Sequence, residues 1–409
     1  MKTKTIKQII LCIIGLLCYH PSNAQVAHKI ETTEDQQLLG LGTQHIFKST
    51  VLQEERPIII SLPIGYEDTG ANYPVLYVLD GLQNIKHTVG TVELLTESGL
   101  IPPLIVVGIE SLDRNRDLTP SNAGQDLHGS TGNAGIPQSG GASKFLKFLR
   151  EELIPFVDVN FRSHSYRILE GHSLGGLFSI YTLMENPNLF DAFVVEAPAL
   201  WWNKEEMTAK ATTFFTSNKN LDKTVYFGIG GGDGWGMRQE LIRYVDVIEQ
   251  HTPNNFKWLH EEVGNEGHMA SRLLLNYKGL KFLFSDLKLS EDLTDNFSDI
   301  AFLKAEQELK KKYGEMARRP AEDYFNLVSV LVENGNDLGA ITVLKRASEV
   351  YPMYIGLLTY LAGLYEKTGQ KNKAIETYLH GVEVSKNYKQ GQEDDLLQEI
   401  SRLEKTNKP

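Results

Sequence analysis

The pattern Gly-x-Ser-x-Gly places Ser173 directly after an apolar, strand-like segment and directly before a helix-like one. A serine in this setting is typical of a nucleophile elbow, a sharp turn that exposes the hydroxyl at the edge of a sheet. Side chains at Gly171 or Gly175 are expected to clash with the neighbouring strand or helix. The N–H of Leu174 and the positive end of the following helix would face the position where an oxyanion forms. The pattern predicts acyl-transfer chemistry at Ser173, with a plain glycine–serine turn as the alternative.

A serine hydroxyl becomes a good nucleophile when a base takes its proton and a third group orients that base. In this kind of elbow the partners follow in the order serine, acid, histidine. His268 lies in a loop of small residues after the last predicted strand and is the expected base, whereas His172 adjoins the serine and is expected to point away from it. Asp233 follows three glycines and is the expected acid, with Glu266 as the alternative. The alternatives are that His268 is a structural histidine and that Asp233 is an ordinary turn residue.

A second oxyanion donor is expected in the turn after the first central strand, where Gly81 and Leu82 are the candidates and a plain turn is the alternative. Arg116 could bind an anionic substrate or pair with neighbouring aspartates. Trp201 and Trp202 could stack on a planar acyl group or belong to the core.

Apolar runs that alternate with helical periodicity must position these residues. Residues 43–62 have the alternation of edge strands. Further strands are predicted at 75–79, 104–109, 166–169, 192–195, 225–229 and 256–260. Strands buried on both faces and separated by helices predict a doubly wound α/β sheet with helices on both faces. Residues 113–141 are rich in Gly, Ser, Asn, Thr and Pro and are expected to form a long loop over the site, with a linker as the alternative.

After Leu289 the strands stop and the chain becomes helical. Small residues recur there after 34 residues, which is the period of a tetratricopeptide repeat. The matched pairs are Gly335 with Gly369, Ala340 with Ala374, and Ala347 with Gly381. Helical stretches at 299–316 and 393–403 are expected to cap or dock the two units. We therefore predict a small all-α domain over residues 289–409, after a hydrolase domain over residues 25–288.

Residues 1–24 are predicted to be a secretory signal peptide, because lysines precede a short apolar run that ends in Ser22-Asn23-Ala24. We therefore expect an exported protein, periplasmic or extracellular, with no membrane span in the mature chain. Both cysteines, Cys12 and Cys18, fall in this segment, so disulfides and thiolate chemistry are excluded from the mature chain. The formal charge of −11 argues against nucleic acid or an anionic membrane as partner.

Several linked motifs resemble the esterase D-like, enterochelin esterase-like branch of the α/β-hydrolases over residues 44–287. They are residues 75–81, 116–120, 140–155, the elbow, 197–202, 267–268 and 279–283. The resemblance implies that Ser173 is the nucleophile, His268 the base and Asp233 the acid, with the turn at 81–82 in the oxyanion hole. Two departures are Ala-Pro-Ala at 197–199, where the family usually has Ser-Pro-Ser, and an aspartate at the acid position, which is often glutamate.

These observations predict an exported serine carboxylester hydrolase that works through an acyl-enzyme, with no metal and no cofactor. The resemblance implies siderophore-type or other small aromatic or sugar esters as substrates. An acyltransferase of the same fold is one alternative. The other is a binding protein that uses the tetratricopeptide-like region for a protein partner and keeps the hydrolase domain as a scaffold.

Overall fold

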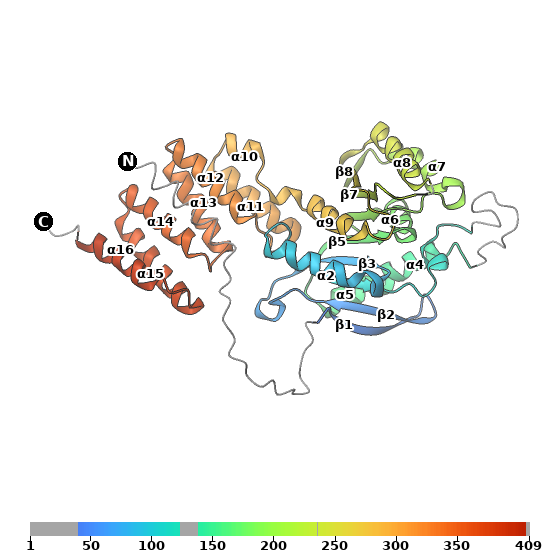
Figure 1. The fold of residues 1–409 in the computed structure, drawn as a ribbon, viewed down its shortest axis with the longest axis horizontal. Coiled ribbons are helices and arrows are strands. Elements are labelled where there is room, and N and C mark those ends of the chain that lie inside the picture. The colour runs from blue at the N-terminus through green and yellow to red at the C-terminus, as the bar shows by residue number, and fades with distance from the viewer. Residues whose placement is uncertain (1–39, 123–137, 235, 406–409) are drawn as a thin grey trace, which may run out of the picture. The chain divides into compact units, whose positions relative to one another are not determined.

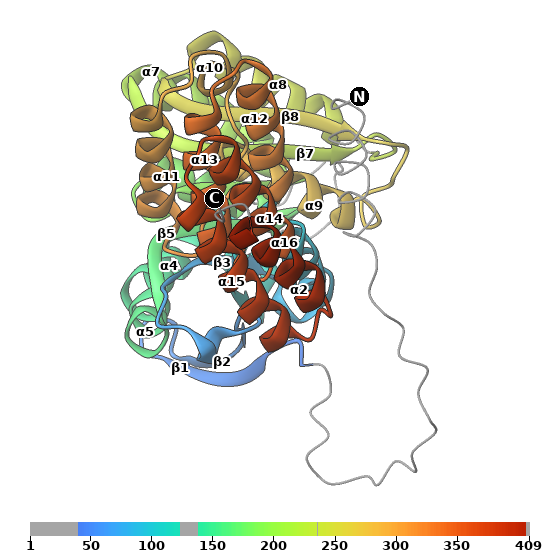
Figure 2. The ribbon, with the colours of Figure 1, turned by 90° about the vertical axis from the view of Figure 1, so that its left-hand side faces the viewer.

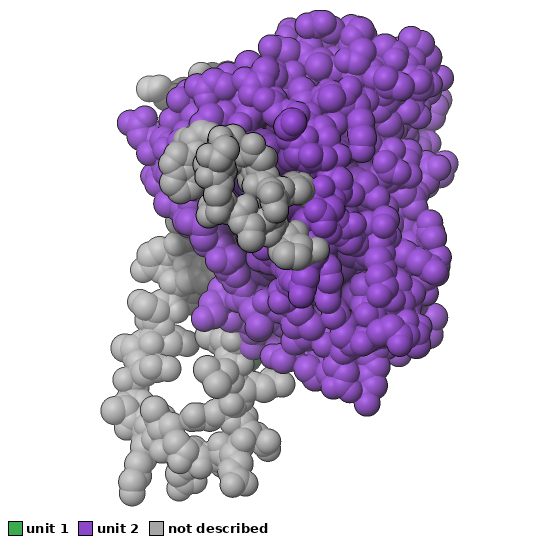
Figure 3. All heavy atoms as spheres, turned by 90° about the vertical axis from the view of Figure 1, so that its right-hand side faces the viewer, with its two compact units in different colours: residues 1–39, 324–409 green, residues 40–323 purple. Residues whose placement is uncertain are grey.

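The computed structural model describes residues 40–122, 138–234 and 236–405, so the predicted signal peptide lies outside the described residues. Its described part divides into two units, residues 40–323 and residues from 324 onward (Figure 1). Figure 3 draws the first unit in purple as closely packed spheres. In the part of the chain that the structure describes, no helix has the length and apolarity that a membrane crossing requires.

The first unit contains one sheet of eight strands in the order β1-β2-β4-β3-β5-β6-β7-β8. The strands are β1 (Thr43–Ser49), β2 (Glu54–Ser61), β3 (Tyr73–Leu79), β4 (Ile105–Ile109), β5 (Ser163–His172), β6 (Ala192–Glu196), β7 (Asn220–Gly230) and β8 (Asn254–Val263). The β1–β2 and β2–β4 pairs are antiparallel, and the other strand pairs are parallel. Figure 2 shows β1 and β2 at one end of the sheet and β7 and β8 at the other. This is the predicted doubly wound α/β fold with an antiparallel edge.

Helices cover both faces of the sheet, so the apolar side chains of the central strands are buried on both sides. On one face lie α4 (Ala142–Phe148), α5 (Ile154–Asn160), α6 (Leu174–Glu185), α7 (Trp202–Ser217) and α8 (Met237–His251). On the other lie α2 (Gly81–Glu97), α9 (Arg272–Leu283) and α11 (Asp299–Tyr313). Short helices complete the unit: α3 (Arg114–Leu118), α10 (Glu291–Asp295), a π-turn at Leu149–Leu153 and 3-10 turns at Tyr66–Asp68 and Ser285–Leu287.

The division between the units falls after Asp323 and not at the predicted boundary of 288 and 289. Residues 289–323 belong to the first unit because several of their side chains pack into its core. The Tyr313 ring packs against Tyr166 of β5 at a centroid distance of 4.8 Å. The Arg319 guanidinium is buried, pairs with Glu306 at 2.7 Å and donates to the carbonyl of Leu287 at 2.9 Å. Helix α11 therefore completes the sheet unit.

The second unit is helical. Its helices are α12 (Ala321–Glu333), which begins at the end of the first unit, α13 (Asp337–Val350), α14 (Ile355–Lys367), α15 (Lys371–Tyr388) and α16 (Glu393–Lys405). Gly335 after α12 and Gly369 after α14 have φ values of 76° and 75°, so both turns need the left-handed backbone that glycine allows. Ala340 and Ala374 are both fully buried, as close helix packing requires. The helix pairs α12–α13 and α14–α15 therefore have matching small residues at the 34-residue period of the sequence.

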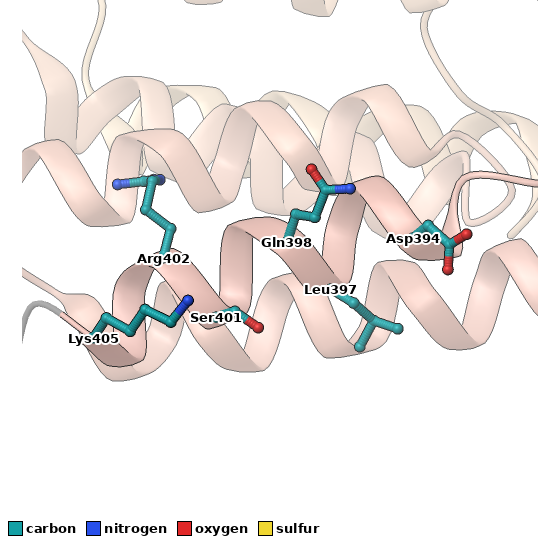
Figure 4. A pocket seen from close by; sticks show the side chains of 6 residues that line it. All are labelled: Asp394, Leu397, Gln398, Ser401, Arg402 and Lys405. Carbon is teal, nitrogen blue, oxygen red and sulfur yellow. The ribbon is translucent and has the colours of Figure 1, made fainter.

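An open depression follows one face of α16 in the second unit (Figure 4). Its lining is mostly polar: Asp394, Leu397, Gln398, Ser401, Arg402 and Lys405. None of the residues predicted to carry chemistry contributes to it.

Candidate active site

Ser173 lies in the turn between β5 and α6, where its φ of 61° and ψ of −113° are strained for a residue with a side chain. Its N–H donates to the Glu196 carbonyl at 2.9 Å, and its own carbonyl accepts from the Ala199 N–H at 3.0 Å. These bonds to β6 and the segment after it hold the strained turn in place. The hydroxyl at such a turn is presented beyond the carboxyl end of the central strand.

The glycines around the turn differ in what they permit. A Cβ on Gly171 would lie 2.4 Å from the backbone carbonyl carbon of Gly175, so the strand can approach the helix only with glycine there. A Cβ on Gly176 would lie 2.9 Å from the Glu196 carbonyl oxygen. A Cβ on Gly175 itself would meet Leu79 at 3.5 Å, which is an ordinary contact. The clash predicted at Gly171 is present, but the one predicted at Gly175 is wrong, because the close approach is at Gly176.

His268 and Asp233 come together from the loops that follow β8 and β7. The His268 Nδ1 lies 2.8 Å from the Asp233 Oδ2, and the Asp233 side chain is only 2% exposed. Because a carboxylate only accepts, Nδ1 carries the proton and Nε2 keeps its lone pair. The alternative acid, Glu266, is exposed. The arrangement orients one imidazole with a free basic nitrogen, which is what a general base needs.

The three glycines before Asp233 make this contact possible. A Cβ at Gly230, Gly231 or Gly232 would lie 2.2, 2.0 and 2.5 Å from backbone carbonyl oxygens of the loop at 264–266. The two loops therefore pack backbone against backbone, and the Gly232 N–H donates to the Glu266 carbonyl at 3.0 Å. Any side chain in this run would push the carboxylate away from the histidine.

The turn after β3 contains the candidates for a second oxyanion donor. A Cβ on Gly81 would lie 2.6 Å from the Gly108 carbonyl carbon, so α2 starts in close contact with β4. The Leu82 N–H donates to the Glu110 carboxylate at 2.9 Å. Asp80 has a φ of 53° and is held by Arg114, whose Nε lies 2.8 Å from its Oδ1. Arg114 thus joins the turn to the start of the predicted loop at 113–141, of which residues 123–137 lie outside the described residues.

Two of the predicted substrate contacts have structural partners. Arg116 donates two parallel bonds of 3.0 Å to Glu54 and a third of 2.7 Å to Asp117. Its guanidinium is therefore held by carboxylates, which is the structural alternative. Trp202 is 1% exposed and its indole N–H donates to the Ser121 carbonyl at 3.1 Å, so it belongs to the core and cannot stack on a ligand as placed. Trp201 is half-buried beside it, with ring centroids 5.7 Å apart.

Buried titratable groups beneath the turn were missed in the sequence. Glu170 of β5 and Glu196 of β6 are each 2% exposed on the same face of the sheet as His172. Burial raises the pKa of Glu170 to about 7, although bonds from Asn276 and Thr88 oppose the shift. Burial, and then the charge of Glu170, raises the pKa of Glu196 well above its usual range. Their acidic residue types inside apolar strands were the available signal.

The fold and the turn at Ser173 define the class of α/β-hydrolases. The chain matches the family described as "Putative esterase" over residues 49–271. It therefore belongs to this family and is a carboxylic ester hydrolase.

Similar proteins agree with this assignment. The chain is 29% identical over 232 residues to the ferri-bacillibactin esterase BesA of Bacillus subtilis, covering 52% of this chain and 79% of that one. It is 26% identical over 254 residues to the siderophore triacetylfusarinine C esterase of Aspergillus fumigatus, covering 58% and 74%. The crystal structure of an IroE-like serine hydrolase from Shewanella oneidensis has the same fold, with a TM-score of 0.60, 22% identity and coverage of 75% and 99%.

Proposed function

We propose that this protein is an exported serine esterase that cleaves siderophore-type esters through an acyl-enzyme formed on Ser173. The observation that carries the proposal is the 2.8 Å bond between His268 Nδ1 and Asp233 Oδ2 in the loops beside the Ser173 turn. The names of the similar siderophore esterases support the substrate class.

In the proposed reaction the Ser173 hydroxyl attacks the ester carbonyl while His268 Nε2 takes its proton. The Leu174 N–H, at the start of α6, would stabilise the oxyanion, and the turn at 81–82 would supply the second donor. The C–O bond to the leaving alcohol then breaks, and the imidazolium returns its proton to that alcohol. Water activated by His268 hydrolyses the acyl-enzyme and regenerates the serine. The Asp233 carboxylate stabilises the imidazolium at both stages.

The substrate class is tested with purified protein and a panel of esters. It contains a ferric catecholate trilactone, a triacetylfusarinine-type ester, acetylated xylan and p-nitrophenyl acetate, with products identified by mass spectrometry. We expect hydrolysis of a siderophore ester with a kcat/KM well above that of acetylated xylan, and no turnover by Ser173→Ala. Preference for acetylated xylan would contradict the siderophore assignment, and transfer of the acyl group to an added sugar in place of water would favour the acyltransferase alternative.

The proposal also includes export and a binding role for the repeat region. The lysine-led apolar segment at 1–24 supports export, and cell fractionation with and without this segment tests it. The nearly equal φ angles of Gly335 and Gly369 support a tetratricopeptide-like unit at the C-terminus. Loss of partner capture from the native host, but not of ester hydrolysis, on disrupting α14 would identify this unit as a binding region.

A further inference from the structure

His172 is the last residue of β5 and directly precedes Ser173. Only 4% of it is exposed, and its side chain lies on the face of the sheet that α2 and α9 cover. The strand register places it beside Glu196 of β6. A polar ring buried at this point needs a partner, since an unsatisfied buried nitrogen destabilises the fold.

The partner is the residue proposed as the base. The His172 Nε2 lies 2.8 Å from the backbone carbonyl oxygen of His268, and the two rings pack with centroids 4.4 Å apart at an angle of 45°. A carbonyl oxygen only accepts, so the Nε2 of His172 carries the proton and donates it. The Ser271 hydroxyl shares this acceptor at the longer distance of 3.3 Å.

Two independent restraints therefore act on His268. Asp233, from the loop after β7, binds the Nδ1 of its ring. His172, from β5, binds its backbone and supports one side of its ring. Because β5 also leads directly into the Ser173 turn, the base is tied to the same strand that carries the serine. A rigid link of this kind fixes the separation of the two groups between which the proton must move.

The surroundings of His172 keep its imidazole neutral. Burial, and then the charge of His268, lowers the pKa of His172 to about 3, while the bond to the His268 carbonyl opposes the shift. The charged groups of Arg272 from α9 and Arg114 from α3 act in the same direction as burial. Burial, and then the charge of Glu170, raises the pKa of Glu196 beside it. A neutral ring can stay against His268 when that residue becomes an imidazolium, without repelling it.

We propose that His172 is a positioning residue, which holds His268 at the distance and orientation that proton transfer from Ser173 requires. This inference rests on the proposed function, since it needs His268 to be the base.

The test compares His172→Phe, which keeps a ring but loses the donor, with His172→Gln, whose amide nitrogen can reach the same carbonyl. The matched control is His260→Phe with His260→Gln, because His260 is a half-buried histidine on β8 that has no role in the proposed site. Active sites are counted by titration with a fluorophosphonate, so that kcat refers to folded, reactive enzyme. KM and the thermal midpoint are measured on the same samples.

We expect His172→Phe to lower kcat per active site by roughly 10- to 100-fold with KM little changed, as a small displacement of a reacting group does. His172→Gln should restore most of the rate, and both His260 variants should keep it. A purely structural role would reduce the number of active sites and leave kcat per site unchanged. That result, or a Gln variant as slow as the Phe variant, would overturn the inference. Inactivity of the wild-type protein towards every ester would instead reject the proposed function.

Discussion

Replacement of Asp233 by asparagine is the perturbation that bears most directly on the site geometry. The change keeps the shape of a side chain that is 2% exposed and removes the charge 2.8 Å from His268 Nδ1. An amide can turn its NH2 group towards Nδ1, and the ring then carries its proton on Nε2. The serine would face an N–H donor in place of a basic lone pair.

The size of the effect follows from the charges that are lost. An imidazolium and a carboxylate with charge centres about 4 Å apart interact by about 4 kcal/mol at an effective dielectric constant of about 20. This energy corresponds to a factor of about a thousand in rate. The loss should fall on kcat, since the buried carboxylate lies behind the imidazole, and KM should change little.

The assay measures kcat and KM for ester hydrolysis by wild type and Asp233→Asn, with circular dichroism to verify folding. Glu266→Gln is the matched control, because Glu266 is the alternative acid and is exposed. We expect the control to remain within about twofold of wild type, as for a surface substitution without a buried partner. A loss of less than tenfold in Asp233→Asn, or an equal loss in Glu266→Gln, would show that Asp233 is not the acid that supports His268.

Three further predictions concern the groups around the turn. Glu110→Ala removes the carboxylate that accepts from the Leu82 N–H at 2.9 Å. If this N–H is to bind an oxyanion, a charge-assisted bond of about 1.5 kcal/mol must first break in the wild type, so kcat/KM should rise by about tenfold in the variant, and an unchanged or lower value would exclude this donor. Glu170 has a folded pKa of about 7 against 4.5 for the free side chain, so between these pH values the folded chain holds a proton that the unfolded chain has released. The free energy of unfolding from urea titrations should therefore fall as pH rises through this window, and it should fall less steeply in Glu170→Gln. Equal slopes in the two proteins would show that another group titrates. Gly171→Ala would bring a Cβ within 2.4 Å of backbone and should destabilise the fold by about 3 kcal/mol or more, whereas Gly175→Ala, with its nearest contact at 3.5 Å, should cost less than about 1 kcal/mol. Chemical denaturation measures both losses of stability, and equal losses would contradict the packing at this turn.

Local sequence patterns were sufficient to predict the α/β class and the two loops that carry Asp233 and His268. Apolar strands predict a buried parallel sheet wherever they occur, and the elbow is a contiguous motif. The glycines before Asp233 also indicate a loop of unusual backbone, although their reason lies elsewhere. They make room for the carbonyl oxygens of a loop more than thirty residues further along the chain, as the 35-residue separation of Asp233 from His268 indicates.

Contacts between distant segments account for what the sequence could not reveal. Arg116 pairs with Glu54, which is 62 residues away, so the neighbouring aspartates gave only part of its environment. His172 reaches His268 across 96 residues, and nothing near either residue indicates that contact. The division between the units falls after Asp323 and not between residues 288 and 289, because α11 packs on β5 through Tyr313, which lies far from β5 in the sequence.

Covalent labelling is the most direct test of whether Ser173 is the nucleophile. Purified wild-type protein is treated with a fluorophosphonate, digested and sequenced by mass spectrometry beside Ser173→Ala. We expect one adduct per chain, on Ser173, formed in step with the loss of ester hydrolysis, and no adduct on the alanine variant. Labelling at another residue, or full ester hydrolysis by Ser173→Ala, would contradict it.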